Sequence, residues 1–582
     1  LPTDNRQPTT GNRQQAVAHR PLSSVLLLRV ISLAFTPVPE FLELLCPAVR
    51  RPSVSRLSPM STADPLDKPA TPRRGTLLPN AVVNLLNFGF SLLIGVFFTP
   101  YVLHKLGPAL YGLIPLTLTI VSYLSVATGG LEIVVSRFVT VALARNDTEG
   151  ANRTFNTAMF SLWGVGLLLI VPLAVAVGFA DSLVQVPGEH VADLRLLFVC
   201  VACSFLLTTS TGSFGVAFFF RNRLDLQGGL AFAANLLRVG IVIVCFSLLE
   251  PRLLHVGLGM CAAAGLTLVG NVFALRHLTP ELRLRSSSWS WAELRRVFGS
   301  VWWLVLNHVG TILLIGIDLL VVNRVFGAVA GTRYALALQW SILLRGVAST
   351  LGGLLAPDIT VLYAKGDTQA LVAYTRKAVR LLALVLALPI GLISGFGKPL
   401  LTVWVGADYA GLAPLMAVLT IPLAVNLAYM PLHNISMASN RVRVPGLVQI
   451  AAGGLNLVLA VGLARYSSLG LYGVALAGGL VLTLRNIVFT PLYAAHILEV
   501  RWHAFLREVL PSAGTTLGVA AVCWLVSRFV PIATWGALIV AGAGVALLYG
   551  VVVYTLLLGP AERAELAKRL GLGGRGLHPL PE

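Results

Sequence analysis

Long apolar stretches recur along the chain from residue 77 onward, and short polar loops separate them. Each stretch is close to the roughly 20 residues that an α-helix needs to cross a bilayer. A backbone in contact with lipid must satisfy its own hydrogen bonds, so we expect helices. The pattern predicts fourteen membrane spans, at residues 79–103, 110–135, 155–180, 194–219, 228–249, 253–275, 299–323, 333–358, 378–397, 410–437, 445–466, 470–496, 510–530 and 535–558.

The stretch from Ser300 to Gly327 contains unusual polar positions, namely Asn307, His308, Thr311 and Asp318. A carboxylate in hydrocarbon is costly, so it usually faces protein or a water-filled path. The asparagine, the threonine and the aspartate recur at intervals of four and seven residues, which places them on one face of a helix. The pattern therefore predicts a polar helix face that is turned into the protein.

The same stretch is the second copy of an earlier one. A shift of 220 residues aligns it with Asn80 to Gly107 and matches Asn87 with Asn307. The shift also pairs residues in later loops: Asp147 with Asp367, Arg221 with Arg441, and Arg223 with Arg443. Six helices per repeat is an even number, so the two halves have the same orientation.

The sequence thus predicts an all-α polytopic membrane protein. Its expected parts are a lobe of six helices at residues 77–298, a second lobe of six at 299–498, and two further helices at 499–559. No loop after residue 77 is large enough for a globular domain outside the membrane.

Composition supports this class, because only 12% of the 582 residues are charged and soluble proteins have about 25%. The net charge of +19 can be interpreted only after the basic residues have been assigned to the loops between the expected spans. With a cytoplasmic N-terminus, 22 basic residues after position 77 fall in inner loops or the C-terminal tail, and 8 fall in outer loops. The positive-inside rule then places both termini in the cytoplasm. The basic charge reflects topology, and no nucleic-acid partner is expected.

The ends of the chain have a different composition. Residues 1–76 are rich in Arg, Pro, Ser and Thr, which predicts a disordered cytoplasmic segment. The first methionine is Met60, so we expect translation to start there and residues 1–59 to lie outside the natural protein. Residues 560–582 are expected to form a cytoplasmic tail. Of the six cysteines, Cys200 and Cys203 form a CxxC, but no second ligand pair accompanies it and no disulfide framework is indicated, so no metal or cofactor is expected.

Several segments carry a family resemblance. NAVVNLLNFGFSLLIGVFFTPYVLHKLGPALYGL in the first half and LLIGIDLLVVNRVFGAVAGTRYALA in the second resemble bacterial oligosaccharide flippases and polysaccharide exporters. These Wzx-like proteins belong to the multidrug/oligosaccharidyl-lipid/polysaccharide (MOP) flippase superfamily. Supporting segments are APDITVLYAKGD, LLTVWVGADYAGLAPLM and NRVRVPGLVQIAAGGLNLVL, and the resemblance covers about residues 77–497.

The resemblance implies a V-shaped pair of lobes that works by alternating access in the bacterial cytoplasmic membrane. It implies a transporter, not an enzyme, that flips a polyprenyl-pyrophosphate-linked oligosaccharide from the inner to the outer leaflet for cell-surface polysaccharide biosynthesis. It also implies membrane lipids, a glycan polymerase and glycosyltransferases as partners. No motif identifies one glycan.

Three arginines lie deep within expected spans: Arg238, Arg345 and Arg485. A guanidinium stays charged when partly buried and donates paired hydrogen bonds to phosphate oxygens. We therefore expect them, together with Asn87, Asn307 and Thr311, to line a cavity for pyrophosphate and sugars. The structural alternatives are an ion pair of Arg345 with Asp318 or Glu132, snorkelling toward an interface, and hydrogen bonds between helices.

Two further roles are expected. Asp318 and Glu132 are candidates for a coupling-ion site, because carboxylates within spans commonly bind a proton or a cation. Pro422 and Pro431 flank Asn426 in one expected span, and a proline kinks a helix, so both are candidate hinges.

Two other functions remain open. A drug or cation antiporter of the same superfamily favours an acidic, aromatic cavity over three arginines. A membrane glycosyltransferase or polymerase that uses the same lipid carrier needs acidic catalytic residues near a sizeable outer loop. The expected outer loops are short.

Overall fold

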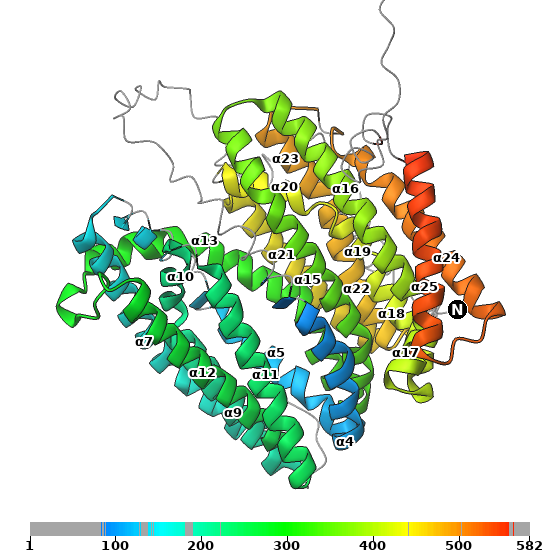
Figure 1. Cartoon of the computed structure of the whole chain (residues 1–582), viewed down its shortest axis with the longest axis horizontal. Coiled ribbons are helices and arrows are strands. Elements are labelled where there is room, and N and C mark those ends of the chain that lie inside the picture. Colours follow the sequence, from blue (N-terminus) through cyan, green and yellow to red (C-terminus); the bar gives the residue numbers. More distant parts are fainter. Residues whose placement is uncertain are drawn as a thin grey trace, which may run out of the picture. The chain divides into compact units, whose positions relative to one another are not determined.

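The computed structural model describes Arg563 and residues 83–557, except 84–85, 88, 127, 130–134, 136–137, 141, 144, 181–189, 222, 440 and 502. In these ranges the regular structure is helical, and no strand occurs. Twelve of the described helices are long and apolar enough to cross a membrane, and two shorter apolar helices accompany them (Figure 1). The all-α polytopic fold is thus confirmed. Residues 1–76, including Met60, and most of the tail at 560–582 lie outside the described residues.

The first half of the described chain forms one group of helices. Its elements are the π-helical turn η1 (Ile94–Phe98), α4 (Thr99–Tyr111), α5 (Leu113–Leu124), α7 (Thr148–Gly178), α9 (Val191–Ser210), η3 (Gly212–Gly215), α10 (Val216–Phe220), α11 (Leu224–Leu248) and α12 (Leu253–Leu278). Helix α12 packs along both α9 and α11, and α7 packs along α9.

The second half forms another group, after the short turn η4 (Ser286–Ser288). Its elements are α13 (Trp291–Ile315), α14 (Ile317–Phe326), α15 (Ala328–Ala364), α16 (Thr368–Gly395), α17 (Gly397–Val405), η5 (Ala407–Leu412), α18 (Ala413–Thr420), α19 (Leu423–Asn426), α20 (Met430–Ala438), α21 (Arg443–Tyr466), α22 (Leu471–Leu484), the π-helical turn η6 (Arg485–Phe489) and α23 (Thr490–Ile497). Helix α21 packs along α13 and α22, and α15 packs along α16.

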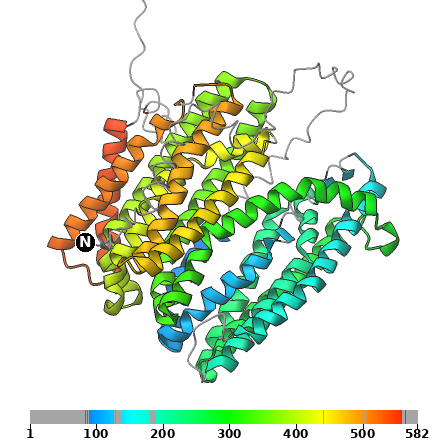
Figure 2. The same ribbon diagram turned by 180° about the vertical axis from the view of Figure 1, so that it is seen from behind.

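The last elements are η7 (Leu506–Glu508), α24 (Leu510–Phe529), α25 (Trp535–Val552) and η8 (Val553–Leu557). Helix α24 packs along α16. Figures 1 and 2 both place α24 and α25 at the margin of the second group, on the side away from α7, α9 and α12. The two helices thus lie at the edge of the second group.

The expected span at 299–323 consists of two helices rather than one. The backbone N–H of Gly316 still donates to the Ile312 carbonyl at 2.7 Å, but a turn separates α13 from α14 at this glycine. The Gly316 carbonyl accepts a hydrogen bond from the Tyr123 hydroxyl at 3.1 Å, so a side chain of α5 satisfies the backbone at the break.

Local backbone geometry recurs at the 220-residue spacing. Gly107 and Gly327 have φ of 78° and 87°, a region that glycine adopts readily. Asp147 caps α7 by accepting from the Gly150 N–H at 2.8 Å, and Asp367 caps α16 by accepting from the Ala370 N–H at 2.9 Å. Equivalent positions in the two sequence repeats therefore have the same local structure.

The two groups contact each other where α13 packs against α7, and at a second place where α4 and α5 pack against α14 and α15. The Thr332 hydroxyl donates to the Pro108 carbonyl, and Gly112 lies against Thr332 and the Ala328 carbonyl. Leu113 and Tyr334 are fully buried in the apolar cluster at this contact. We call this region the Gly112 end.

Other helix faces expose large apolar side chains. Leu168 of α7 is 71% exposed and Leu547 of α25 is 75% exposed. Such exposure in a soluble protein is unusual, and lipid covers these faces in a membrane protein.

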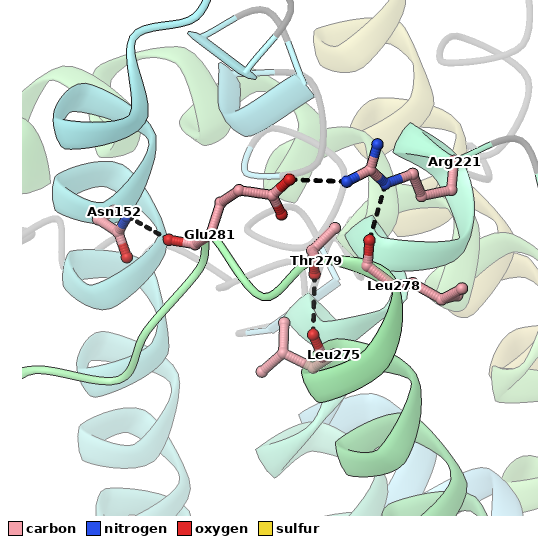
Figure 3. Close-up of polar contacts among 6 residues, drawn as sticks. All are labelled: Asn152, Arg221, Leu275, Leu278, Thr279 and Glu281. Carbon is pink, nitrogen blue, oxygen red and sulfur yellow. Dashed lines mark hydrogen bonds and ion pairs between the residues drawn. The ribbon is translucent and has the colours of Figure 1, made fainter.

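Helix α7 begins directly after Asp147, and we call this region of the molecule the Asp147 end. Here side chains hold the segment from Thr279 to Arg285 in place through hydrogen bonds (Figure 3). Asn152 donates to the Glu281 carbonyl and accepts from the Arg283 N–H, both at 2.8 Å. Asn156 donates to the Arg283 carbonyl at 2.8 Å and accepts from the Arg285 N–H at 2.7 Å. Two asparagines one turn apart thus pair with an extended segment as a neighbouring strand would.

An ion pair joins the same segment to the helix before α11. Arg221 contacts the Glu281 carboxylate at 2.7 Å and donates to the Leu278 carbonyl at 2.7 Å (Figure 3). The connection between the two groups of helices is therefore anchored to α7 and to the end of α10.

We expect Asn156→Ala to lower stability by about 1–3 kcal/mol, because it removes the hydrogen bonds that a buried amide makes to the Arg283 carbonyl and the Arg285 N–H. Asn156 is fully buried, whereas Arg153 on the same helix is exposed and pairs with the exposed Glu149. Thermal unfolding in detergent measures the effect, with Arg153→Ala as the matched control. Equal melting temperatures for the two variants would contradict this account of the segment.

Candidate functional site

The three arginines within spans lie near the middle of their helices. Arg238 lies in α11, Arg345 in α15, and Arg485 is the first residue of η6. None of them forms an ion pair with a described residue. In addition, the Nε atoms of Arg238 and Arg485 are buried and have no hydrogen-bond partner within the described ranges. Three positive charges thus lie in the interior of the bundle without a described carboxylate bound to them.

Asp318 is buried in α14 and is 6% exposed. Its carboxylate accepts from Asn456 Nδ2 of α21 at 3.0 Å and from the Tyr334 hydroxyl of α15 at 3.2 Å. Arg345 interacts with it electrostatically but lies beyond the 4.0 Å limit of an ion pair. The direct partners of the carboxylate are therefore neutral donors.

The Asp318 cluster has spare acceptor atoms. Asn456 Oδ1 is buried and has no hydrogen-bond partner among the described residues. Helix α22 approaches closely at Gly478, where a Cβ would lie 3.0 Å from the Asp318 carboxylate and 3.6 Å from Asn456 Oδ1. Carboxylate and amide oxygens are the ligand types that hard cations prefer. The described residues contain no group of three or more His, Cys, Asp or Glu side chains able to hold a metal ion.

A second cluster surrounds Arg485. The guanidinium contacts Asn486 Oδ1 at 3.2 Å and His433 Nε2 at 3.4 Å. Asn307 lines the same pocket, which has a volume of about 200 Å³. The structure thus brings together two of the residues that the sequence nominates, and it adds His433 and Asn486 to them.

Thr311 and Asn87 make hydrogen bonds between helices. The Thr311 hydroxyl accepts from Gln449 Nε2 of α21 at 3.2 Å and donates to the Asn307 carbonyl at 2.9 Å. Asn87 Nδ2 donates to the Gly228 carbonyl of α11 at 2.6 Å. Both contacts match the structural alternative considered for these residues. Glu132 lies outside the described residues.

The span that contains both candidate hinge prolines is broken twice. Pro422 lies at the N-terminal cap of α19, and Pro431 lies in the first turn of α20. Asn486 Nδ2 of η6 donates to the Asn426 carbonyl and side-chain oxygen at 3.4 and 3.3 Å. Asn426 Nδ2 in turn donates to the Thr483 hydroxyl at 3.1 Å. Polar side chains of the neighbouring span therefore satisfy the backbone near the break.

Known structures share this arrangement of helices. A multidrug resistance MATE family transporter of the MOP superfamily, in its inward-facing conformation, aligns with a TM-score of 0.55 at 16% identity, covering 72% of this chain and 99% of that one. The lipid II flippase MurJ, in an inward closed conformation, aligns with a TM-score of 0.51 at 13% identity, covering 80% and 99%. The chain therefore has the fold that this MATE family transporter and MurJ share.

A relative by sequence defines the family more narrowly. The chain is 35% identical over 490 residues to the "Uncharacterized membrane protein EpsK" of Bacillus subtilis (strain 168), across 84% of this chain and 97% of that protein. The chain belongs to the family of EpsK and is a multi-pass membrane protein. No protein-family model matches it.

Proposed function

We propose that the protein is a flippase that moves a polyprenyl-pyrophosphate-linked oligosaccharide from the inner to the outer leaflet of the bacterial cytoplasmic membrane. The observation that carries this proposal is the set of interior arginines, none of which forms an ion pair with a described carboxylate. Fixed positive charge in a low-dielectric interior is costly unless an anion offsets it. A pyrophosphate linked to a lipid supplies that anion.

The fold supports the proposal. MurJ, which has the same arrangement of helices, is described as a lipid II flippase. The neighbours with drug-transporting descriptions share the fold equally, so the side chains decide between the two functions. Three interior arginines favour an anionic cargo over a cationic drug.

The distribution of basic residues indicates which end of the protein faces the cytoplasm, and therefore the direction of transport. The Asp147 end contains Arg153, Arg221, Arg283 and Arg285, and the positive-inside rule assigns this end to the cytoplasm. The Gly112 end then faces outward. In the proposed cycle, cargo enters from the cytoplasmic side, and glycosyltransferases and a glycan polymerase act before and after translocation.

Asp318 is assigned a coupling role in the same cycle. Its carboxylate is buried and accepts hydrogen bonds from neutral donors, and it lies next to Asn456 Oδ1, which has no hydrogen-bond partner among the described residues. A proton or a small cation there neutralises the carboxylate and changes its electrostatic interaction with Arg345. Ion binding and cargo binding are thereby linked through one pair of charges.

Reconstitution into liposomes tests the function. A short-chain polyprenyl-pyrophosphate glycan is placed in both leaflets, and its accessibility to an external lectin or glycosidase is followed over time. The proposal expects translocation that depends on the protein. Transport of a small organic cation without translocation of the glycan lipid would favour the antiporter instead, and turnover of the glycan lipid to a new product would favour an enzyme.

A further inference from the structure

The Arg485 pocket lies where one span departs from α-helical geometry. Helix α22 ends at Leu484, the π-helical turn η6 follows, and α23 continues to Ile497. A π-turn inside a helix costs backbone hydrogen-bond regularity and frequently marks a functional position. Arg485 and Asn486 are the first two residues of this turn, and their side chains are in contact at 3.2 Å.

His433 of α20 faces the guanidinium as a neutral acceptor. Its Nδ1 lies 3.3 Å from the Tyr429 carbonyl, which only accepts, so Nδ1 carries the proton. Its Nε2 lies 3.4 Å from Arg485 Nη2, which only donates. Both contacts fit the neutral imidazole, and a protonated ring beside the guanidinium is unfavourable. The pair therefore holds one positive charge.

The pocket has room for an anion and donors to bind it. Its volume of about 200 Å³ far exceeds the roughly 10–15 Å³ that one water molecule requires. Arg485 Nε is buried and has no described partner, so one guanidinium donor is unused. The rest of the lining consists of the neutral polar side chains Asn307, Ser436, Thr490 and Tyr493 and of the apolar side chains Leu432, Met437, Pro445 and Phe489.

We propose that this pocket binds a phosphoryl group, and that in the transport cycle it holds the pyrophosphate of the lipid-linked cargo, an assignment that rests on the proposed function. A guanidinium donates paired, charge-assisted hydrogen bonds to phosphate oxygens. No described carboxylate forms an ion pair with Arg485, so none competes with the ligand. Asn307 and Thr490 supply further hydrogen bonds from α13 and α23.

Binding of a phosphoryl group in the pocket is coupled to the break between α19 and α20. Asn486 Oδ1 accepts from both Arg485 and the Thr490 hydroxyl, while Asn486 Nδ2 donates to Asn426 at the end of α19. A phosphoryl group that draws Arg485 and Thr490 toward itself removes both donors from Asn486. The hydrogen bonds at the break between α19 and α20 then change with binding.

Binding is tested on the purified full chain in detergent, with thermal stability as the readout. The probes are inorganic pyrophosphate, farnesyl pyrophosphate and farnesol. We expect the two pyrophosphates to raise the melting temperature of the wild type and farnesol to have no such effect. A larger effect of farnesyl pyrophosphate identifies a lipid headgroup as the ligand, and equal effects at equal concentration identify the free anion.

Three variants locate the site. Arg485→Gln is expected to weaken pyrophosphate binding at least tenfold, and Asn307→Leu is expected to weaken it while leaving the Arg485 contacts intact. Arg528→Gln, at an exposed arginine of α24 that stacks on Trp524, is the matched control. Unchanged pyrophosphate stabilisation in both pocket variants, or none in the wild type, would overturn the assignment.

The same preparations separate this assignment from the proposed function. If pyrophosphate binding depends on Arg485 but the glycan lipid is not translocated in liposomes, the phosphoryl-binding pocket is supported and the flippase function is rejected. If translocation persists in Arg485→Gln, the flippase function is supported, and the pocket is rejected as the binding site of the cargo pyrophosphate.

Discussion

Replacing Arg345 by alanine is expected to slow translocation of a pyrophosphate-linked glycan by about tenfold to a hundredfold in liposomes. A hydrogen bond to a charged group contributes roughly 1.5–3 kcal/mol, and each 1.4 kcal/mol corresponds to a factor of ten. Arg345 lies mid-helix in α15 and forms no ion pair with a described residue, so folding does not depend on such a pair. The rate is measured as the gain of lectin-accessible glycan over time.

Two controls define the result for Arg345. Arg345→Lys keeps the positive charge but loses the planar guanidinium and its paired N–H donors, so we expect a translocation rate between those of the wild type and Arg345→Ala. Arg465→Ala, in the last turn of α21, removes an arginine near the end of a span and is expected to leave the rate unchanged. A wild-type rate in Arg345→Ala would show that this arginine does not contact the cargo.

Asp318→Asn is expected to abolish the response of transport to an imposed cation or proton gradient. The substitution preserves shape and lets the Tyr334 hydroxyl keep an oxygen acceptor, but it removes the charge that binds the ion. Flipping is compared with and without a sodium gradient or a pH gradient across the liposome membrane. We expect the wild type to respond to one of the two and the variant to neither.

The matched control for Asp318 is Asp358→Asn. Asp358 is an exposed carboxylate on α15 that accepts from the Tyr374 hydroxyl at 2.7 Å. It shares the residue type and a tyrosine partner but lies on the surface, so its loss should leave the gradient response intact. An Asp318→Asn variant that still follows the gradient would assign coupling to another group.

The sequence predicts the spans and the repeat well because both depend on local information. A bilayer requires a fixed length of apolar residues, and the backbone at Gly107 and Gly327, or at Asp147 and Asp367, is set by the residue itself and its nearest neighbours. These features appear in the structure at the expected positions.

The partners of the buried polar residues could not be predicted in the same way. Asp318 aligns with Phe98 under the repeat, so its contacts with Asn456 and Tyr334 have no counterpart that the first half would reveal. Which asparagine faces a carboxylate depends on the rotation of α21 against α14, which apolar helix sequences specify weakly.

The contact between Arg485 and Asn486 escaped prediction for a different reason, although the sequence nominated Arg485 and Asn307 for one cavity. Adjacent residues lie about 100° apart around an α-helix, so helical periodicity does not pair these two side chains, which are in contact at 3.2 Å. The π-turn has no sequence signal of its own. The double break in the span of Pro422 and Pro431 was signalled by the prolines, although its hydrogen bonds to Asn486 were not.

The Gly112 contact has a consequence for the balance between conformations. A Cβ at this position would overlap the Thr332 hydroxyl and would lie 3.0 and 3.1 Å from backbone atoms of Thr332 and Ala328. Any larger residue at position 112 therefore acts as a wedge, and it favours whichever state holds the two groups of helices apart there. Conformational preference can thus be tuned by one side chain that touches neither the arginines nor Asp318, independently of affinity for cargo or ion.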